Sequence, residues 1–138
     1  MNREWLARVA NDAQELGVPL PPAMTEALGT YANLLVAWNE KVNLTAITDD
    51  EGIAIRHFVD SLSVVPLVPE GATLIDVGTG AGFPGIPVAL VRSDVRVTLL
   101  DSLDKRVNFL NAVTCELALK NARTQHGQIG RASWGGKI

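Results

Sequence analysis

The chain has 138 residues, of which 47% are hydrophobic and 20% are charged, the proportions of a soluble globular protein with room for one modest domain. No apolar run approaches the roughly 20 residues that span a membrane, and the mixed N-terminus is no signal peptide, so we expect a cytoplasmic protein with no membrane partner. The net charge of −3 and the pI near 5.3 argue against strong nonspecific binding to nucleic acid.

The first 70 residues space their apolar side chains as helices do, in three stretches. The first stretch ends before Gly17, which stands where a C-terminal cap belongs. The second opens at Pro22, in the tolerated first turn of a helix, and carries an apolar stripe that we expect in the core: Met24, Leu28, Tyr31, Leu35, Trp38 and Val42. The stretch Thr48–Glu51 matches a capping box and predicts a third helix that continues to about Val65.

The pattern then changes to alternating strands and helices. Short apolar or β-branched runs predict strands at Thr73–Val77, Val95–Leu100 and Asn121–His126. Helices are expected between them, from about Pro84 to Val91 and from a Ser102 cap through Leu103 to Leu117. This β-α-β-α-β order predicts an α/β fold with a parallel sheet and right-handed crossovers.

The single cysteine, Cys115, falls within the last of these helices. With one cysteine no internal disulfide can form, which fits a reducing cytoplasm. Because Val113 and Leu117 belong to the apolar stripe around it, we expect a buried structural thiol.

Composition and pattern divide the chain into three parts. Residues 1–70, with four basic and ten acidic residues, form an N-terminal helical lobe, and residues 71–127 form the first half of an α/β domain. Residues 128–138 hold several glycines without a clear period and are expected to be a disordered tail. A doubly wound sheet has about five or six strands, so a three-stranded one indicates a fragment or a sheet completed by another chain.

A stretch that begins inside the first predicted strand and continues into a glycine-rich loop reads LIDVGTGAGFPG, from Leu74 to Gly85. Gly80-x-Gly82-x-x-Gly85 fits the dinucleotide fingerprint, whereas Asp76-x-Gly78-x-Gly80-x-Gly82 fits the nucleoside loop of methyltransferases. Both patterns place backbone N–H groups and a helix N-terminus beside a ligand. Both also need an acid at the end of the next strand to bind ribose hydroxyls, and Asp101 stands there.

Two features favour S-adenosylmethionine over NAD as the cofactor. Asp76 lies inside the first strand, where it can accept backbone N–H bonds from the loop or face the ammonium group of the ligand. Some 70 helical residues precede that strand, as methyltransferases often carry an N-terminal lobe for substrate recognition. Such a lobe points to a methyltransferase only by analogy between folds.

These residues resemble the RsmG family, also called glucose-inhibited division protein B. The matching motifs are NLTAI from Asn43, RHFVDSL from Arg56, DVGTGAGFPGIP from Asp76 and LLDSLDKRVNFL from Leu99, within residues 5–127. The family consists of bacterial methyltransferases of guanine N7 in small-subunit (16S) ribosomal RNA. The resemblance therefore implies a Rossmann-like class I methyltransferase fold, the cofactor S-adenosylmethionine, and 16S rRNA or the small ribosomal subunit as partner.

The resemblance also implies cofactor contacts at Gly78 and Phe83 and a ribose contact at Asp101. A further adenine-side contact follows the third strand in a motif of the form His-Gly-Arg-Ala-Glu, where this chain reads HGQIG from His126. Ile129 and Gly130 occupy the contact positions, and only their backbone can substitute. With Asp76, Gly80 and Gly82 of the loop, these residues complete the predicted cofactor site, and no metal site is expected.

Four residues of the helical lobe are candidates for the active cleft. Asn43 and Thr45 face the cleft by resemblance, or serve turns and caps between helices. Arg56 reaches phosphate, lines the cleft or forms a surface ion pair. His57 is interpreted as a structural or RNA-contacting residue in preference to a catalytic one, because guanine N7 has a free lone pair and needs no general base.

The predicted function is methylation of guanine N7 in 16S rRNA, with the 138-residue chain weakly active or inactive because its sheet is short and its adenine-side motif is altered. Two alternatives stay open from the sequence. One is a fragment of an NAD-dependent oxidoreductase, and the other is a non-catalytic cofactor-binding module.

Overall fold

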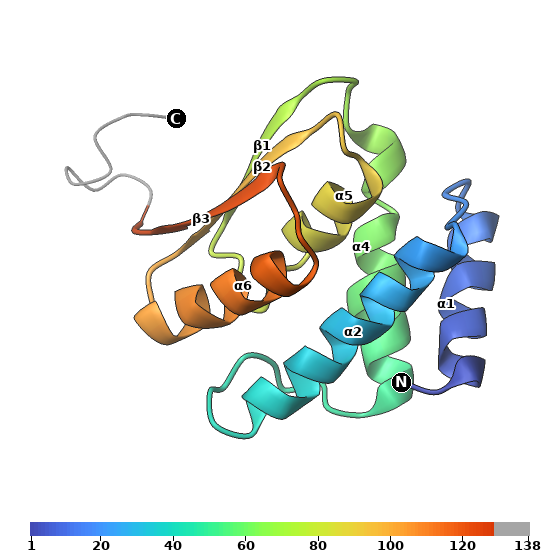
Figure 1. The fold of residues 1–138 in the computed structure, drawn as a ribbon, viewed down its shortest axis with the longest axis horizontal. Coiled ribbons are helices and arrows are strands. Elements are labelled where there is room, and N and C mark those ends of the chain that lie inside the picture. The colour runs from blue at the N-terminus through green and yellow to red at the C-terminus, as the bar shows by residue number, and fades with distance from the viewer. Residues whose placement is uncertain (129–138) are drawn as a thin grey trace.

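The computed structural model describes residues 1–128, and its first helices form a lobe beside the sheet (Figure 1). Helix α1 (Arg3–Glu15) begins at Asn2, whose side chain accepts a hydrogen bond from the Trp5 N–H at 2.8 Å, and ends before Gly17 at φ +80°. Helix α2 (Pro22–Asn39) follows. It stops three residues short of Val42, which still packs against the core from the following loop.

The third helix is built from segments of different winding. They are α3 (Asp50–Gly52), the π-helical η1 (Ile53–Val59) and α4 (Asp60–Leu62), and the 3₁₀ turn η2 (Val65–Leu67) comes after them. The residue that caps it is Asp49, whose carboxylate accepts the Gly52 N–H at 2.9 Å. The expectation of a capping box led by Thr48 was therefore wrong, since Glu51 reaches Arg8 at 3.2 Å instead.

The sheet has three parallel strands in the order of the chain: β1 (Thr73–Val77), β2 (Arg96–Asp101) and β3 (Ala122–His126). Ile75 pairs with Thr98, and Leu99 pairs with Thr124. These bounds lie within one residue of the predicted ones. The prediction of an α/β fold with a short parallel sheet is confirmed for residues 1–128.

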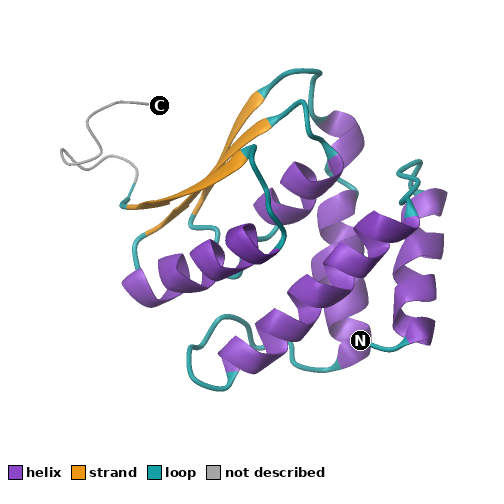
Figure 2. Ribbon diagram, viewed as in Figure 1, coloured by secondary structure: helices purple, strands orange, loops and turns teal. Residues whose placement is uncertain are grey.

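Helices α5 (Gly85–Val91) and α6 (Asp104–Glu116) cross over on the same face of the sheet (Figure 2). Two right-handed crossovers that progress in one direction must place their helices on one side. The expected Ser102 cap was wrong: α6 starts at Asp104 without a side-chain cap, and Leu103 is 49% exposed rather than part of the apolar stripe. The backbone just before α6 is instead hydrogen-bonded to Asp101, whose carboxylate accepts the Leu103 N–H at 3.0 Å.

Helix α2 lies at the centre of the molecule and joins the lobe to the α/β part. It contacts α1 on one side and both α5 and α6 on the other. Tyr31 of α2, Phe58 of η1 and Phe109 of α6 are completely buried. Trp38 meets Phe109 edge to face at 5.7 Å, which confirms its expected place in the core. Lobe and sheet therefore share one hydrophobic core.

Cys115 is exposed, so the expectation of a buried thiol was wrong. Successive helical residues turn by about 100°, and Cys115 therefore points almost opposite to Val113, which is the buried residue. Within the part of the chain that the structure describes, no helix is long and apolar enough to cross a membrane.

Candidate functional site

The glycine loop between β1 and α5 is packed tightly on its inner side. Gly82 has φ +98°, and a Cβ there would lie 2.5 Å from Ile86 Cδ1 and 2.7 Å from the Tyr31 hydroxyl. A Cβ on Gly85 would lie 2.5 Å from Leu99 Cδ2 and 2.8 Å from Asp76 Oδ2. Only glycine satisfies both positions, so the backbone is pressed against the sheet and α5.

The same loop is open on its outer side. Gly78 and Gly80 have φ +65° and +60°, and a Cβ at either position would meet no atom within 4 Å. Both residues lie beyond the carboxyl end of β1, the edge of a parallel sheet where ligands bind. The open space beside Gly78 and Gly80 is the first candidate for a ligand site.

Asp76 ties the end of β1 to the loop that follows. Its Oδ2 accepts the Thr79 hydroxyl at 2.6 Å and the Gly85 N–H at 2.9 Å. Burial raises the pKa of Asp76 above its ordinary value of 3.8, these two hydrogen bonds lower it, and the nearby Asp101 raises it further. The predicted role of fixing the loop by accepting backbone N–H bonds agrees with this geometry.

Asp101, at the end of β2, is 1% exposed. Its Oδ2 accepts the Gly80 N–H at 2.9 Å, its Oδ1 accepts the Leu103 N–H at 3.0 Å, and Arg106 Nη1 lies 3.7 Å from Oδ1. The carboxylate thus braces both the glycine loop and the approach to α6. A ribose contact at Asp101 would require the side chains that cover it to move aside.

Phe83 lies in a cluster of aromatic rings that joins the loop to the lobe. Its ring stacks on His57 at 4.5 Å with an interplanar angle of 2°, and on Tyr31 at 5.1 Å with an angle of 19°. Phe58 tilts against it at 5.3 Å. The Tyr31 hydroxyl donates to the Ala81 carbonyl at 2.5 Å, so α2 also holds the loop through a buried hydrogen bond.

Thr45 and His57 are brought together in the lobe, with 2.8 Å between Oγ1 and Nε2. Burial and the neighbouring Arg56 lower the pKa of His57 below its ordinary 6.5, and Asp60 opposes them, so the imidazole is neutral at pH 7. Asn39, at the end of α2, accepts the backbone N–H groups of Leu44 at 2.9 Å and Thr45 at 3.0 Å.

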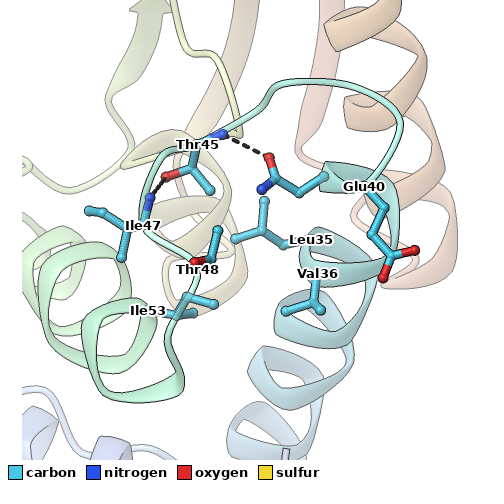
Figure 3. Close-up of a pocket in the computed structure, with 8 residues that line it drawn as sticks. Leu35, Val36, Glu40, Thr45, Ile47, Thr48 and Ile53 are labelled. Atoms are coloured by element: carbon cyan, nitrogen blue, oxygen red, sulfur yellow. Dashed lines mark hydrogen bonds between the residues drawn. The ribbon is translucent and has the colours of Figure 1, made fainter.

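Thr45 also lines a cavity of about 320 Å³ between the end of α2 and the loop after it (Figure 3). Half of the lining side chains are apolar, and Asn39, Glu40 and Thr48 join Thr45 as the polar members. Of the four cleft candidates, Thr45 and His57 meet, whereas Asn43 and Arg56 are exposed. Ile129 and Gly130 lie outside the described residues.

Tyr31 and Asn39 support the site without having been predicted to do so. Tyr31 belonged to an apolar stripe and was expected only in the core. Asn39 is a polar residue that follows directly on Trp38 of that stripe. A polar residue at this point is consistent with the end of α2 at Asn39, from where its side chain bonds the backbone of the next loop.

Residues 24–134 match the GidB family, described as rRNA small subunit methyltransferase G. This match covers most of the chain. The chain belongs to this family. The resemblance inferred from the motifs is thereby confirmed.

Two members of the methyltransferase G family illustrate the similarity. A protein of Clostridium botulinum (strain Alaska E43 / Type E3), named Ribosomal RNA small subunit methyltransferase G, is 56% identical over 118 residues, which are 84% of this chain and 49% of that protein. Its namesake in Clostridium perfringens (strain SM101 / Type A) is 57% identical over 100 residues, 71% of this chain and 42% of that protein. The chain spans about half the length of these curated relatives.

Among solved structures, coclaurine N-methyltransferase bound to N-methylheliamine and SAH is similar in fold. The TM-score is 0.48 and the sequence identity 14%, over 94% of this chain and 40% of that one.

Proposed function

We propose that this methyltransferase G family member binds S-adenosylmethionine at its glycine loop and serves methyl transfer to guanine N7 of 16S rRNA. The observation that carries the proposal is the open backbone edge at Gly78 and Gly80, beside the carboxylates of Asp76 and Asp101. A nucleoside with a positively charged sulfur fits such an edge, because it needs close backbone approach and gains from nearby negative charge.

The proposed cofactor site is made from the loop and the strand ends. Gly78 and Gly80 present backbone to the nucleoside, with the buried Gly82 shaping the loop behind them, and Asp76 keeps that backbone in place through Thr79 and Gly85. Phe83 is covered by three rings, so its contact with the cofactor is limited to a ring edge or to its backbone. When bound, the cofactor supplies an electrophilic methyl group on sulfur.

The lobe is the proposed substrate side. Guanine N7 has a free lone pair, so the residues of the chain need only hold the base in line with the methyl group and exclude competing water. Asn43, Thr45, Arg56 and His57 are proposed to border that cleft. The exposed Arg56 is suited to a phosphate of the RNA, with 16S rRNA or the small ribosomal subunit as partner.

The 138-residue chain by itself is expected to transfer methyl groups weakly or not at all. It spans about half the length of its curated relatives. Where the resemblance implies an adenine-side motif of the form His-Gly-Arg-Ala-Glu, this chain reads HGQIG from His126. Cofactor binding and methyl transfer are therefore tested separately.

Calorimetry tests the cofactor. The chain is titrated with S-adenosylhomocysteine and, in parallel, with NADH. Binding of the first and not of the second supports the proposal, and the reverse favours the oxidoreductase alternative. Incubation with S-adenosylmethionine and small-subunit rRNA, followed by mass spectrometry for 7-methylguanine, then tests the reaction. Substantial turnover by the chain alone would contradict the expected weak activity.

A further inference from the structure

His57 contacts both sides of the proposed cleft. Toward the lobe, its Nε2 lies 2.8 Å from Thr45 Oγ1. Toward the glycine loop, its ring lies flat on Phe83 at 4.5 Å. The residue itself belongs to η1, a π-helical segment, and such segments are frequent at functional sites.

The polar contacts of Thr45 favour one position for the hydrogen in this pair. Thr45 Oγ1 accepts the Ile47 N–H at 3.0 Å through one of its two lone pairs, and its single hydrogen gains an acceptor when it points at His57. His57 Nε2 is then the acceptor, and the imidazole carries its proton on Nδ1. This assignment satisfies the three polar groups that meet at Thr45.

The contacts form a continuous path from α2 to the glycine loop. Asn39 holds the backbone of Thr45, Thr45 holds His57, and His57 stacks on Phe83. Phe83 in turn follows Gly82, whose N–H donates to the Thr79 carbonyl at 3.0 Å inside the loop.

We propose that His57 is a positioning residue that holds Phe83, and with it the glycine loop, in fixed register with the 40–48 loop. This inference rests on the proposed function in one respect: it takes the glycine loop as the cofactor side and the 40–48 loop as the substrate side. On this account Thr45 influences the cofactor loop through His57 alone, without touching it.

The test compares Thr45→Val, which keeps the shape and removes the hydroxyl, with Thr45→Ser, which keeps the hydroxyl. Both changes are made in the natural chain and in a His57→Phe background, where a ring still stacks but cannot bond residue 45. Amide hydrogen exchange is measured at Gly82, with the amides of β2 as the reference for global stability. Nitrogen NMR reads the His57 tautomer, and His126, the only other histidine, is the exposed internal control.

The proposal expects Thr45→Val to raise exchange at Gly82 about tenfold above the β2 reference. Thr45→Ser should restore natural exchange, and the His57→Phe background should abolish the difference between the two. Unchanged exchange at Gly82 in Thr45→Val, or an equal increase in the His57→Phe background, would overturn the coupling. A proton on Nε2 in the unaltered chain would overturn the assignment without any variant.

The same variants separate this inference from the proposed function. If the coupling holds, Thr45→Val should also weaken S-adenosylhomocysteine binding several-fold, and Thr45→Ser should not. Absence of S-adenosylhomocysteine binding by the unaltered chain would contradict the proposed cofactor, while the exchange result would still decide the role of His57.

Discussion

The carboxylate of Asp76 accepts the backbone N–H of Gly85 at 2.9 Å, which joins the end of β1 to the first residue of α5. The same oxygen accepts the Thr79 hydroxyl, so one partly buried side chain is hydrogen-bonded to both the start and the end of the glycine loop. Because glycine at residue 85 brings the helix within reach of this oxygen, the shape of the loop depends on both residues together.

Asp76 should give the chain a recognisable pH dependence. Its pKa is raised in the folded state, chiefly by burial, so the folded state binds more protons than the unfolded state between the ordinary 3.8 and the raised value. The stability contributed by this group therefore increases as pH falls from neutral toward 4.

Asp76→Asn removes this titration while keeping an oxygen acceptor. The difference in free energy of unfolding between the natural chain and Asp76→Asn, measured by urea denaturation at several pH values, should shift in favour of the natural chain as pH falls. A difference that is independent of pH, or that shifts the other way, would contradict the raised pKa.

Gly82 and Gly78 should respond very differently to alanine. Gly82→Ala combines a strained φ of +98° with overlap onto Ile86 and Tyr31, and should cost about 3–5 kcal/mol of unfolding free energy. Gly78→Ala meets open space and should cost only about 1–2 kcal/mol, from backbone strain. Urea unfolding measures both. Equal losses would show that the loop is not packed as described.

Gly78→Ala has a second use, because its methyl group would enter the space assigned to the cofactor. We expect this variant to stay folded and to lose at least tenfold in affinity for S-adenosylhomocysteine, about 1.4 kcal/mol. Calorimetry of the folded variant measures this. Natural affinity in Gly78→Ala would place the ligand elsewhere.

Tyr31 is the only tyrosine of the chain, so its ionisation can be followed without interference. Burial, and to a smaller extent Asp76, raise the pKa of its hydroxyl well above the ordinary 10.0. The unfolded state releases this proton above pH 10 and the folded state does not, so stability is lost as pH rises beyond 10.

Tyrosinate absorbance should therefore appear only together with the loss of helical circular dichroism. Ionisation in a chain that is still folded would contradict the buried hydrogen bond to Ala81. Tyr31→Phe should leave that carbonyl without its donor, at a cost of about 1–3 kcal/mol.

Asp101→Asn should destabilise the chain by about 1–3 kcal/mol, because an amide can accept through only one of the two atoms that now serve Gly80 and Leu103. Asp104→Asn is the matched control, with the same change of charge at a side chain that is 84% exposed. Urea unfolding should separate the two variants. If the Asp101→Asn chain is as stable as the Asp104→Asn control, the two hydrogen bonds from Gly80 and Leu103 to Asp101 do not stabilise the fold as described.

The strands and most helices could be predicted because apolar periodicity and strand length are local properties of the sequence. Thr73–Val77 was predicted with its observed bounds, and the Asp49 cap lay one residue from the predicted one. The exposure of Cys115 was missed because a helical stripe was assigned without following the angle of each residue around the helix.

The candidate site was predicted as a set of residues but not as an arrangement. The motif indicated Asp76 and Asp101, yet their bonds to Gly85, Gly80 and Leu103 depend on how β1, β2 and the loop approach one another. The π-helical winding around His57 and the rings that enclose Phe83 arise from packing between segments far apart in sequence. No local pattern encodes such contacts.

The central claim is that the open edge of the glycine loop is a cofactor site, and an NMR titration of the chain with S-adenosylhomocysteine tests it most directly. We predict that the amide signals of Gly78 and Gly80 shift most, with smaller changes at Gly82, Asp101 and Phe83. Largest shifts around the cavity lined by Leu35 and Ile53, or none at the loop under saturating ligand, would contradict it.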